Sequence, residues 1–182
     1  MTTLAKWSVE DYHLMIDSGV LNNRSVELLE GEIIEMSPEG PLHSATNDNA
    51  AEYLRELLRG RARIREAHPI TLRNSEPEPD IAVVRLQESN YSDHHPYPED
   101  IYWLIEISNT TLDEEGGRKK KIYAHAGINE YWVIDLKATA IIVFQDPSGD
   151  HYQTKFTVNE GRITPIAFWD LQIEVATLLG RA

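Results

Sequence analysis

Apolar residues repeat along the chain with two different periods, which separate the expected helices from the expected strands. Small and apolar side chains recur every three to four residues over residues 44–59, which predicts a long amphipathic helix that ends at Gly60. Over residues 101–107, apolar side chains occupy both faces of an extended segment, as is typical of a central strand buried on both sides. The pattern therefore predicts an α/β fold in which helices pack against a buried sheet.

Shorter patterns predict further elements on either side of this core. Ser8 followed by Asp11 is a capping-box-like opening for a short helix that ends near Gly19. Residues 25–29 and 32–36 are β-rich and are separated by two turn residues, so they predict a hairpin. The other expected elements are strands at 62–72, which Pro69 could interrupt, 81–86 and 131–135, a long loop at 87–100, a helix at 115–126, and β-rich segments at 140–144, 151–158 and 162–166.

The composition is that of an ordinary globular domain. The 182 residues are 41 % hydrophobic and 26 % charged, without repeats or a Pro/Gly/Ser linker, so we expect residues 1–182 to form one domain. The chain has no apolar run of about eighteen residues and no signal-like N-terminus, so we expect a cytoplasmic protein without membrane contact. The absence of cysteine excludes thiolate metal sites and a cysteine nucleophile, which makes oxygen-ligated metals the natural cofactors.

The formal net charge of −13 argues against a generic nucleic-acid coat protein. Contact with DNA would need a local concentration of positive charge or a divalent cation that screens the repulsion. Ten of the seventeen basic residues fall in two stretches, which are Arg55, Arg59, Arg61, Arg63, Arg65 and Arg73, followed by Arg118, Lys119, Lys120 and Lys121.

Two carboxylates lie at places where a charge requires a partner. Glu106 interrupts the apolar strand and is expected to share one face with Tyr102 and Leu104, where an unpaired carboxylate would be costly. Asp80 directly precedes the strand expected over residues 81–86. If the two strands are neighbours, both carboxylates face one point.

One lysine of the second basic stretch is expected to point toward the same place. With about 100° between successive helical residues, Lys119 lies in line with Ile122 and Tyr123, the stripe that should face the core. Lys120 and Lys121 rotate toward solvent. Together, the two carboxylates and this lysine are the set that can hold a hard divalent metal and an attacking water against a phosphodiester.

Each of these signals has a plain structural explanation when it is taken alone. A Glu near a strand end is commonly a rim residue, a Pro-Asp pair is commonly a turn, and a lysine run is commonly a solvated helix face. The shared direction of the three side chains is what favours a site. His94 and His95 could bind a metal, but adjacent loop histidines are usually solvated, and no HxH or HExxH spacing supports them.

Four blocks of sequence, in order along the chain, resemble the Uma family of restriction endonucleases in the PD-(D/E)XK nuclease superfamily. They are residues 26–38, 75–81, 105–108 and 119–132. The resemblance implies a restriction endonuclease-like core, a central mixed sheet flanked by helices, here with extra β-hairpins at both ends. It also implies that Asp80 and Glu106 bind magnesium or manganese.

The chain departs from the superfamily's basic signature at Ser108, where a lysine is expected two positions after Glu106. The resemblance implies that the lysine comes from the following helix instead, as Lys119. It also matches Glu27 to an acidic position near the start of the first hairpin and His43 to a histidine just before the long helix. The nucleic-acid-binding candidates are His43, Arg55, Arg59 and Arg73.

The resulting prediction is a metal-dependent endonuclease that hydrolyses DNA phosphodiester bonds, with Asp80, Glu106, Lys119 and Glu27 as candidate catalytic residues. Two alternatives stay open. One is a nucleic-acid-binding or interaction protein that keeps a nuclease scaffold without cleavage, and the other is a hydrolase of a smaller phosphoester, which the acidic charge would suit. Paired cuts on duplex DNA would favour a homodimer, which the sequence does not establish.

Overall fold

The computed structural model describes residues 3–109 and 115–181, and for residues 115 and 116 the backbone alone. The elements in chain order are α1 (Val9–Asp17), β1 (Val26–Leu29), β2 (Glu32–Glu35), α2 (Pro41–Leu57), β3 (Arg63–Glu66), β4 (Ile81–Val84), η1 (Pro98–Asp100), β5 (Ile101–Ser108), α3 (Glu115–His125), β6 (Glu130–Asp135), β7 (Ala140–Ser148), β8 (His151–Val158), β9 (Arg162–Ile163), β10 (Ile173–Glu174) and α4 (Val175–Leu178).

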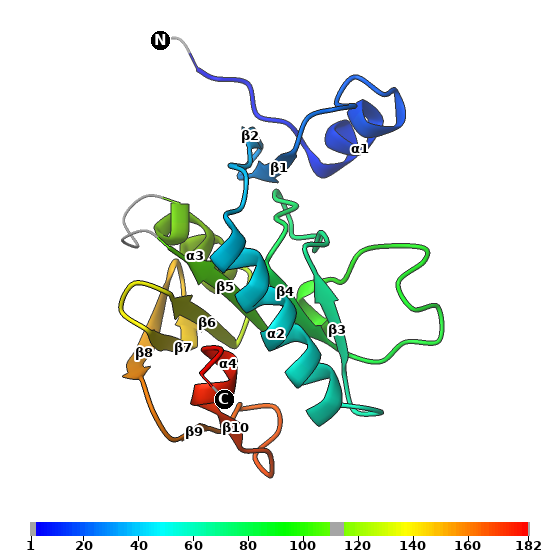
Figure 1. Cartoon of the computed structure of the whole chain (residues 1–182). Coiled ribbons are helices and arrows are strands. Elements are labelled where there is room, and N and C mark those ends of the chain that lie inside the picture. Colours follow the sequence, from blue (N-terminus) through cyan, green and yellow to red (C-terminus); the bar gives the residue numbers. More distant parts are fainter. Residues whose placement is uncertain (1–2, 110–114, 182) are drawn as a thin grey trace.

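A six-stranded mixed sheet forms the centre of the molecule (Figure 1). Its strands follow the order β3-β4-β5-β6-β7-β8, and only the β5/β6 pair is parallel among these neighbours. Parallel neighbours need a crossover connection, which α3 supplies between β5 and β6. The α/β fold with a central mixed sheet and flanking helices is confirmed.

Neighbouring residues of the central strands pack on opposite faces of the sheet. Trp103 and Trp132, whose rings lie 5.4 Å apart, pack on the face covered by α2 and α4. Leu104 and Tyr131 point to the opposite face, where they pack with Tyr123 of α3. The expectation that β5 is buried on both sides is therefore confirmed, and each face of the sheet has its own apolar layer.

The helix α1 and the β1/β2 hairpin form a smaller unit beside the sheet (Figure 1). Ser8 and Asp11 make the expected capping box at the start of α1. The hydroxyl of Tyr12 donates to the carbonyl oxygen of Val26 at 2.9 Å, and this bond attaches the helix to the hairpin. The hairpin turns at Gly31, whose φ of +77° suits glycine.

Two expected boundaries are wrong. The long helix begins at Pro41 rather than at residue 44, because Gly40 is extended and Pro41 occupies the first helical turn without needing an N–H partner. His43 therefore lies in the first turn of α2 rather than before it. The strand expected over residues 62–72 ends at Glu66, because the backbone turns at Ala67, with a φ of +45°, and leaves the sheet.

The expected face of Tyr102 is also wrong. The pairing of β4 with β5 shifts register between Val83 and Val84. Leu104 shares the α3 face as expected, but Tyr102 packs on the α2 side, where its ring lies 4.9 Å from that of Phe168. A register irregularity of this kind breaks the simple alternation of side chains along a strand.

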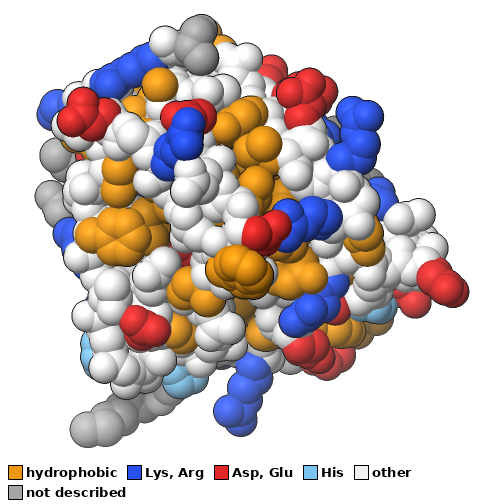
Figure 2. Space-filling view, turned by 90° about the horizontal axis from the view of Figure 1, so that it is seen from below, with side chains coloured by type: hydrophobic (Ala, Val, Ile, Leu, Met, Phe, Trp, Pro, Cys, Tyr) orange, Lys and Arg blue, Asp and Glu red, His pale blue; other side chains and the backbone are white. Residues whose placement is uncertain are grey.

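The chain after β8 contains elements that the sequence pattern did not resolve. The strands β9 and β10 pair as a small antiparallel sheet, and the short helix α4 follows directly. Ile166 and Trp169, in the segment between these strands, are 50 % and 85 % exposed. Figure 2 views the molecule from this end and shows hydrophobic side chains gathered among charges of both signs. In the described part of the chain, no helix combines the length and apolarity needed to span a membrane.

Candidate active site

Asp80 and Glu106 lie next to each other at one end of the central strands. Because Ile81 pairs with Ile105 in the antiparallel β4/β5 ladder, Asp80 stands opposite Glu106, and both belong to the α3 side. The backbone N–H of Ile107 donates to Asp80 Oδ2 at 2.5 Å. The two carboxylate side chains are only 13 % and 15 % exposed. The structure thus places the two nearly buried acids side by side.

Lys119 reaches the acid pair from the first half of α3. Its Nζ lies 3.1 Å from Glu27 Oε2 and 3.3 Å from Glu106 Oε1, and it donates to the carbonyl oxygen of Glu78 at 3.0 Å. The side chain is 14 % exposed. The inward direction that helical spacing predicted for Lys119 is therefore the observed one, and the hairpin, the sheet and α3 meet at its ammonium group.

The two neighbouring lysines of α3 behave differently from each other. Lys121 is exposed, as expected. Lys120, which was also expected in solvent, is half-buried, and its ammonium group lies 5.2 Å from the centre of the Phe144 ring. The aromatic face attracts the cation, so this part of the expectation is wrong.

Two contacts hold the acids of the site in place, and the sequence analysis found neither. The Tyr123 hydroxyl donates to Glu106 Oε1 at 2.7 Å. The backbone N–H of Glu78 donates to Glu27 Oε2 at 3.0 Å. The sequence could have predicted the contact of Tyr123, because this residue lies one helical turn after Lys119 on the same face of α3. The Glu27 contact depends on how the hairpin docks, which no local pattern reveals.

Burial and the neighbouring charges shift the pKa values of Glu106 and Lys119. Burial, together with the negative charges of Asp80 and Glu27, raises the pKa of Glu106 to about 7, although Lys119 and Tyr123 act in the other direction. Burial lowers the pKa of Lys119, but Glu106 and Glu27 more than offset this effect and hold the pKa above its usual range. Lys119 is therefore a protonated donor at neutral pH and is poorly suited to accept a proton while these contacts last.

His43 contacts Asp80 from the start of α2. Its Nε2 lies 3.1 Å from Asp80 Oδ2, and its Nδ1 lies 3.3 Å from Glu39 Oε2. The hydrogen bond with Asp80 raises the pKa of His43, burial opposes this rise, and the charges of Asp80 and Glu39 reinforce it. One ligand atom from each of these three residues lies within 4.8 Å of the others, and they are the only group of three potential ligands at this spacing within residues 3–109 and 115–181. Glu106 lies outside that group, beside Asp80.

The candidate DNA-binding arginines lie apart from this cluster. Arg55 forms ion pairs with Glu66 and Glu52. It follows His43 by twelve helical residues, so it lies about 18 Å further along α2. Arg59, beyond the end of α2, and Arg73 are exposed.

Other arginines of the same stretch contact neighbouring side chains within the molecule. The partner is Asp170 for Arg61, Asn90 for Arg63, and the rings of His95 and Tyr91 for Arg65. The Asp170 carboxylate neutralises Arg61, and the other contacts fix the orientation of Arg63 and Arg65.

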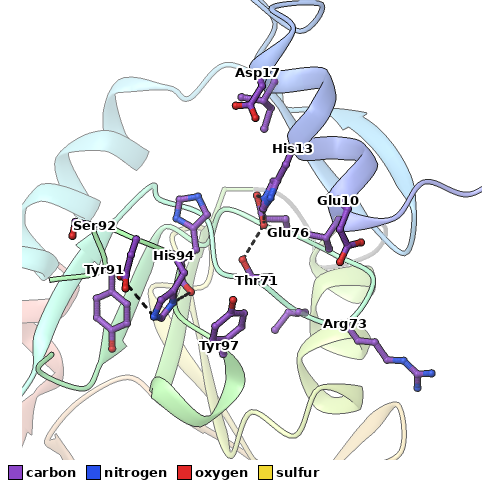
Figure 3. Close-up of a pocket in the computed structure, with 15 residues that line it drawn as sticks. Glu10, His13, Asp17, Thr71, Arg73, Glu76, Tyr91, Ser92, His94 and Tyr97 are labelled. Carbon is purple, nitrogen blue, oxygen red and sulfur yellow. Dashed lines mark hydrogen bonds and ion pairs between the residues drawn. The ribbon is translucent and has the colours of Figure 1, made fainter. Parts of the chain in front are cut away.

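Two hollows lie outside the carboxylate cluster. One, of about 640 Å³, lies between α1 and the segments around residues 71–76 and 91–97 (Figure 3). On its wall, the buried Glu76 is hydrogen-bonded by His13 and Thr71, and the His94 ring stacks on Tyr97. The second, of about 930 Å³, runs along the outer edge of α3. Asp80, Glu106 and Lys119 line neither hollow, so their chemistry rather than the hollow size marks the candidate site.

The mixed sheet, with its acid pair and lysine at one end, defines a restriction endonuclease-like class of protein. Residues 9–176 match the family described as "Uma2: Putative restriction endonuclease", and the chain belongs to this family.

A solved structure supports the same fold. The chain is similar to "a putative nuclease belonging to DUF820 from Anabaena variabilis ATCC 29413", with 20 % identity and a TM-score of 0.69 over 86 % of this chain and 90 % of that chain. At this level of identity the likeness bears on the fold alone. No curated protein matches the sequence.

Proposed function

We propose that this chain is a metal-dependent endonuclease that hydrolyses DNA phosphodiester bonds. The observation that carries the proposal is the proximity of Asp80, Glu106 and Lys119: Asp80 stands opposite Glu106 in the β4/β5 register, and Lys119 Nζ lies 3.3 Å from Glu106 Oε1. Membership of a family described as restriction endonucleases supports DNA as the substrate. The proposal treats residues 1–182 as a single nuclease domain, since the family match spans nearly the whole chain.

Asp80 and Glu106 are the residues we assign to Mg²⁺ or Mn²⁺. Their oxygen donors suit either ion, and burial, together with the charges of Asp80 and Glu27, raises the pKa of Glu106, a rise that a nearby divalent cation would oppose. A bound cation would supply Lewis-acid polarisation of the phosphodiester and lower the pKa of a water molecule. The backbone N–H of Ile107 fixes the orientation of Asp80, and Tyr123 fixes that of Glu106.

Lys119 is assigned the role that the superfamily lysine has two positions after the second acid, where this chain has Ser108. As a protonated donor, it can offset the charge that develops on phosphate oxygens. Glu27 is then a positioning residue, because it contacts Lys119 and is itself held by the N–H of Glu78. This role is narrower than the candidate catalytic role that the sequence suggests for Glu27.

The basic residues that contact the DNA backbone are proposed to be Arg59 and Arg73. Both are exposed, and neither has an ion-pair partner in the described part of the chain. Arg55 is the weaker candidate because two glutamates already neutralise it. His43 touches Asp80 rather than open surface, so it acts at the acid cluster instead of on a distant phosphate.

The test is cleavage of supercoiled plasmid and of single-stranded DNA, with Mg²⁺ or Mn²⁺, by the full chain. Asp80→Ala and Glu106→Ala should each abolish cleavage, and Lys119→Ala should lower the rate at least about a hundredfold. Lys121→Ala, an exposed neighbour on α3, is the matched control and should keep full activity. Circular dichroism checks that each variant folds. Full activity of Lys119→Ala would show that the role assigned to this lysine is wrong.

The acidity of the chain motivates two rival functions, which the same assay separates. Nucleotides, a chromogenic phosphodiester and RNA are tested beside DNA. Cleavage of small diesters without cleavage of DNA would identify a hydrolase of smaller phosphoesters. Binding of DNA without cleavage of any substrate, at high protein concentration and with either metal, would identify a binding protein on a nuclease scaffold.

A homodimer is the proposed form for paired cuts on duplex DNA, since two sites related by a twofold axis match the symmetry of the duplex. The exposed Ile166 and Trp169, between β9 and β10, offer apolar area for such a contact. Sedimentation with and without DNA tests this part of the proposal, and a single monomeric species under both conditions would exclude it.

A further inference from the structure

We propose that Glu39, His43 and Asp80 form a nitrogen-containing metal site that binds a transition-metal dication such as Mn²⁺ in preference to Mg²⁺. The inference deepens the proposed function, with which it shares Asp80, and it adds two ligands that the nuclease assignment did not include. The preference for a transition metal follows from the imidazole of His43.

The spacing of the three side chains fits a single ion. His43 Nε2 and Asp80 Oδ2 lie 3.1 Å apart, whereas Glu39 Oε2 lies 3.3 Å from Nδ1, the other ring nitrogen. Neighbouring ligands of an octahedral ion with bonds of about 2.1 Å are themselves about 3 Å apart, as His43 Nε2 and Asp80 Oδ2 are. One ligand atom of each residue lies within 4.8 Å of the others, so a cation held by Nε2 and Asp80 comes within reach of Glu39 once the Glu39 side chain turns away from Nδ1.

The surroundings hold the ligands in place before an ion binds. Gly40 and Pro41 start α2 between Glu39 and His43, which puts these two side chains together four residues apart. The Ser44 hydroxyl donates to Glu39 Oε2 at 3.3 Å. On the opposite side, Asp80 is held by the N–H of Ile107.

The imidazole of His43 has the features of a metal ligand. Its Nδ1 is buried and makes no aligned hydrogen bond with the described residues, although Glu39 is near. Its position in the first turn of a rigid helix limits the movement of the ring.

The donor set and the local charge determine which ion fits. Imidazole nitrogen suits transition-metal dications such as Zn²⁺, Fe²⁺ and Ni²⁺ better than it suits Mg²⁺, which prefers oxygen ligands and water, and Mn²⁺ is the member of the series that also favours carboxylate oxygen. Glu39 and Asp80 supply two negative charges, and Lys119 is already shared between Glu27 and Glu106. A dication therefore meets a surplus of negative charge and one nitrogen donor.

The experiment uses Mn²⁺ as the probe on the metal-free full chain. Titration followed by electron paramagnetic resonance gives the stoichiometry and the affinity, and electron spin-echo modulation detects nitrogen bound directly to Mn²⁺. The wild type should show one nitrogen-bound Mn²⁺, which Mg²⁺ displaces only at large excess. His43→Gln should lose the nitrogen signal and bind at least about tenfold more weakly. Glu39→Gln should keep the signal and bind more weakly.

Two further variants separate this inference from the nuclease proposal. Glu106→Gln should keep the nitrogen signal, because Glu106 lies outside the group of three. Glu56→Gln, exposed on the same helix, is the surface control and should match the wild type. Thermal unfolding checks that all variants fold. A nitrogen signal in a protein that cleaves no DNA would preserve the metal site and contradict the nuclease proposal.

Three results would overturn the inference. The first is Mn²⁺ bound to the wild type without a nitrogen signal, which would mean an oxygen-only site at Asp80 and Glu106. The second is a nitrogen signal that persists in His43→Gln, which would assign it to another histidine. The third is the absence of measurable Mn²⁺ binding to the folded protein at millimolar metal.

Discussion

At the scale of single residues, Lys119 links three parts of the fold through its ammonium group. It contacts Glu27 of the hairpin, Glu106 of the sheet and the carbonyl oxygen of Glu78. A buried cation of this kind adds little net stability, because its desolvation offsets the attraction to its partners. Its removal is nevertheless costly, since two nearly buried carboxylates then lose their compensating charge.

This imbalance leads to a prediction about Lys119→Met, which keeps the length of the side chain without its charge. The variant should lose about 3 kcal/mol of unfolding free energy in urea denaturation. Adding Glu27→Gln to Lys119→Met should recover part of this loss, because it removes one of the stranded charges. If the two substitutions simply add their separate costs, the two side chains are not coupled in the folded state.

At the scale of elements, the β1/β2 hairpin brings Glu27 to Lys119. The way the hairpin is attached to the rest of the fold therefore determines the position of Glu27 in the site. Arg118 of α3 holds the hairpin from one side, through the carbonyl oxygen of Leu29 and the carboxylates of Glu30 and Glu32. On the other side, α1 packs on the hairpin through Tyr12. The position of Glu27 thus depends on two elements that are far away in sequence.

The attachment of α1 gives a prediction at alkaline pH. Burial, reinforced by the charges of Glu78 and Glu76, raises the pKa of Tyr12 to about 12. The folded protein holds this proton more tightly than the unfolded chain, so the unfolding free energy should fall as pH rises from about 10 to about 12. In Tyr12→Phe this contribution, up to about 2 kcal/mol, should be missing.

The measurement is urea unfolding of the wild type and of Tyr12→Phe at several values between pH 9 and pH 12. Other tyrosines also ionise in this range, so the quantity of interest is the difference between the two proteins. This difference should shrink with rising pH. A difference that stays constant over the whole range would mean that Tyr12 ionises at its ordinary pKa in the folded state.

At the scale of the whole molecule, the charge of −13 opposes the proposed substrate. Many of the basic residues are paired within the fold, as Arg55, Arg61 and Arg118 illustrate. The acid cluster is the place where DNA would have to approach most closely. A divalent cation at this cluster would change the sign of the local interaction, so binding of DNA should depend on the metal.

We therefore predict that the wild type binds a short DNA duplex more tightly in Ca²⁺ than in a chelator. At a pH well above the Glu106 pKa of about 7, where this side chain is ionised, the double variant Asp80→Asn/Glu106→Gln should bind more tightly than the wild type in the chelator, because two negative charges are removed from the site. Fluorescence anisotropy at fixed salt measures both effects. Glu56→Gln/Glu160→Gln changes the net charge equally on exposed surface and is the matched control. Equal gains in both double variants would refute a local effect.

Local periodicity was sufficient to predict the fold class and the directions of the main site residues. The alternation of strand residues placed Asp80 and Glu106 on one face, and the helical period turned Lys119 inward, because both periods are properties of the backbone alone. The same reasoning failed for Tyr102, where a register shift interrupts the alternation. It also failed for Lys120, which an aromatic ring holds against the surface.

Only the tertiary structure decided which distant residues complete the cluster. Glu27 contacts Lys119 because the hairpin docks on α3. His43, with Glu39 beside it, contacts Asp80 because α2 begins at Pro41, near the start of β4. These contacts join segments separated by long stretches of chain. They depend on how packed layers and loops place whole elements, and a pattern of neighbouring residues carries no information about that placement.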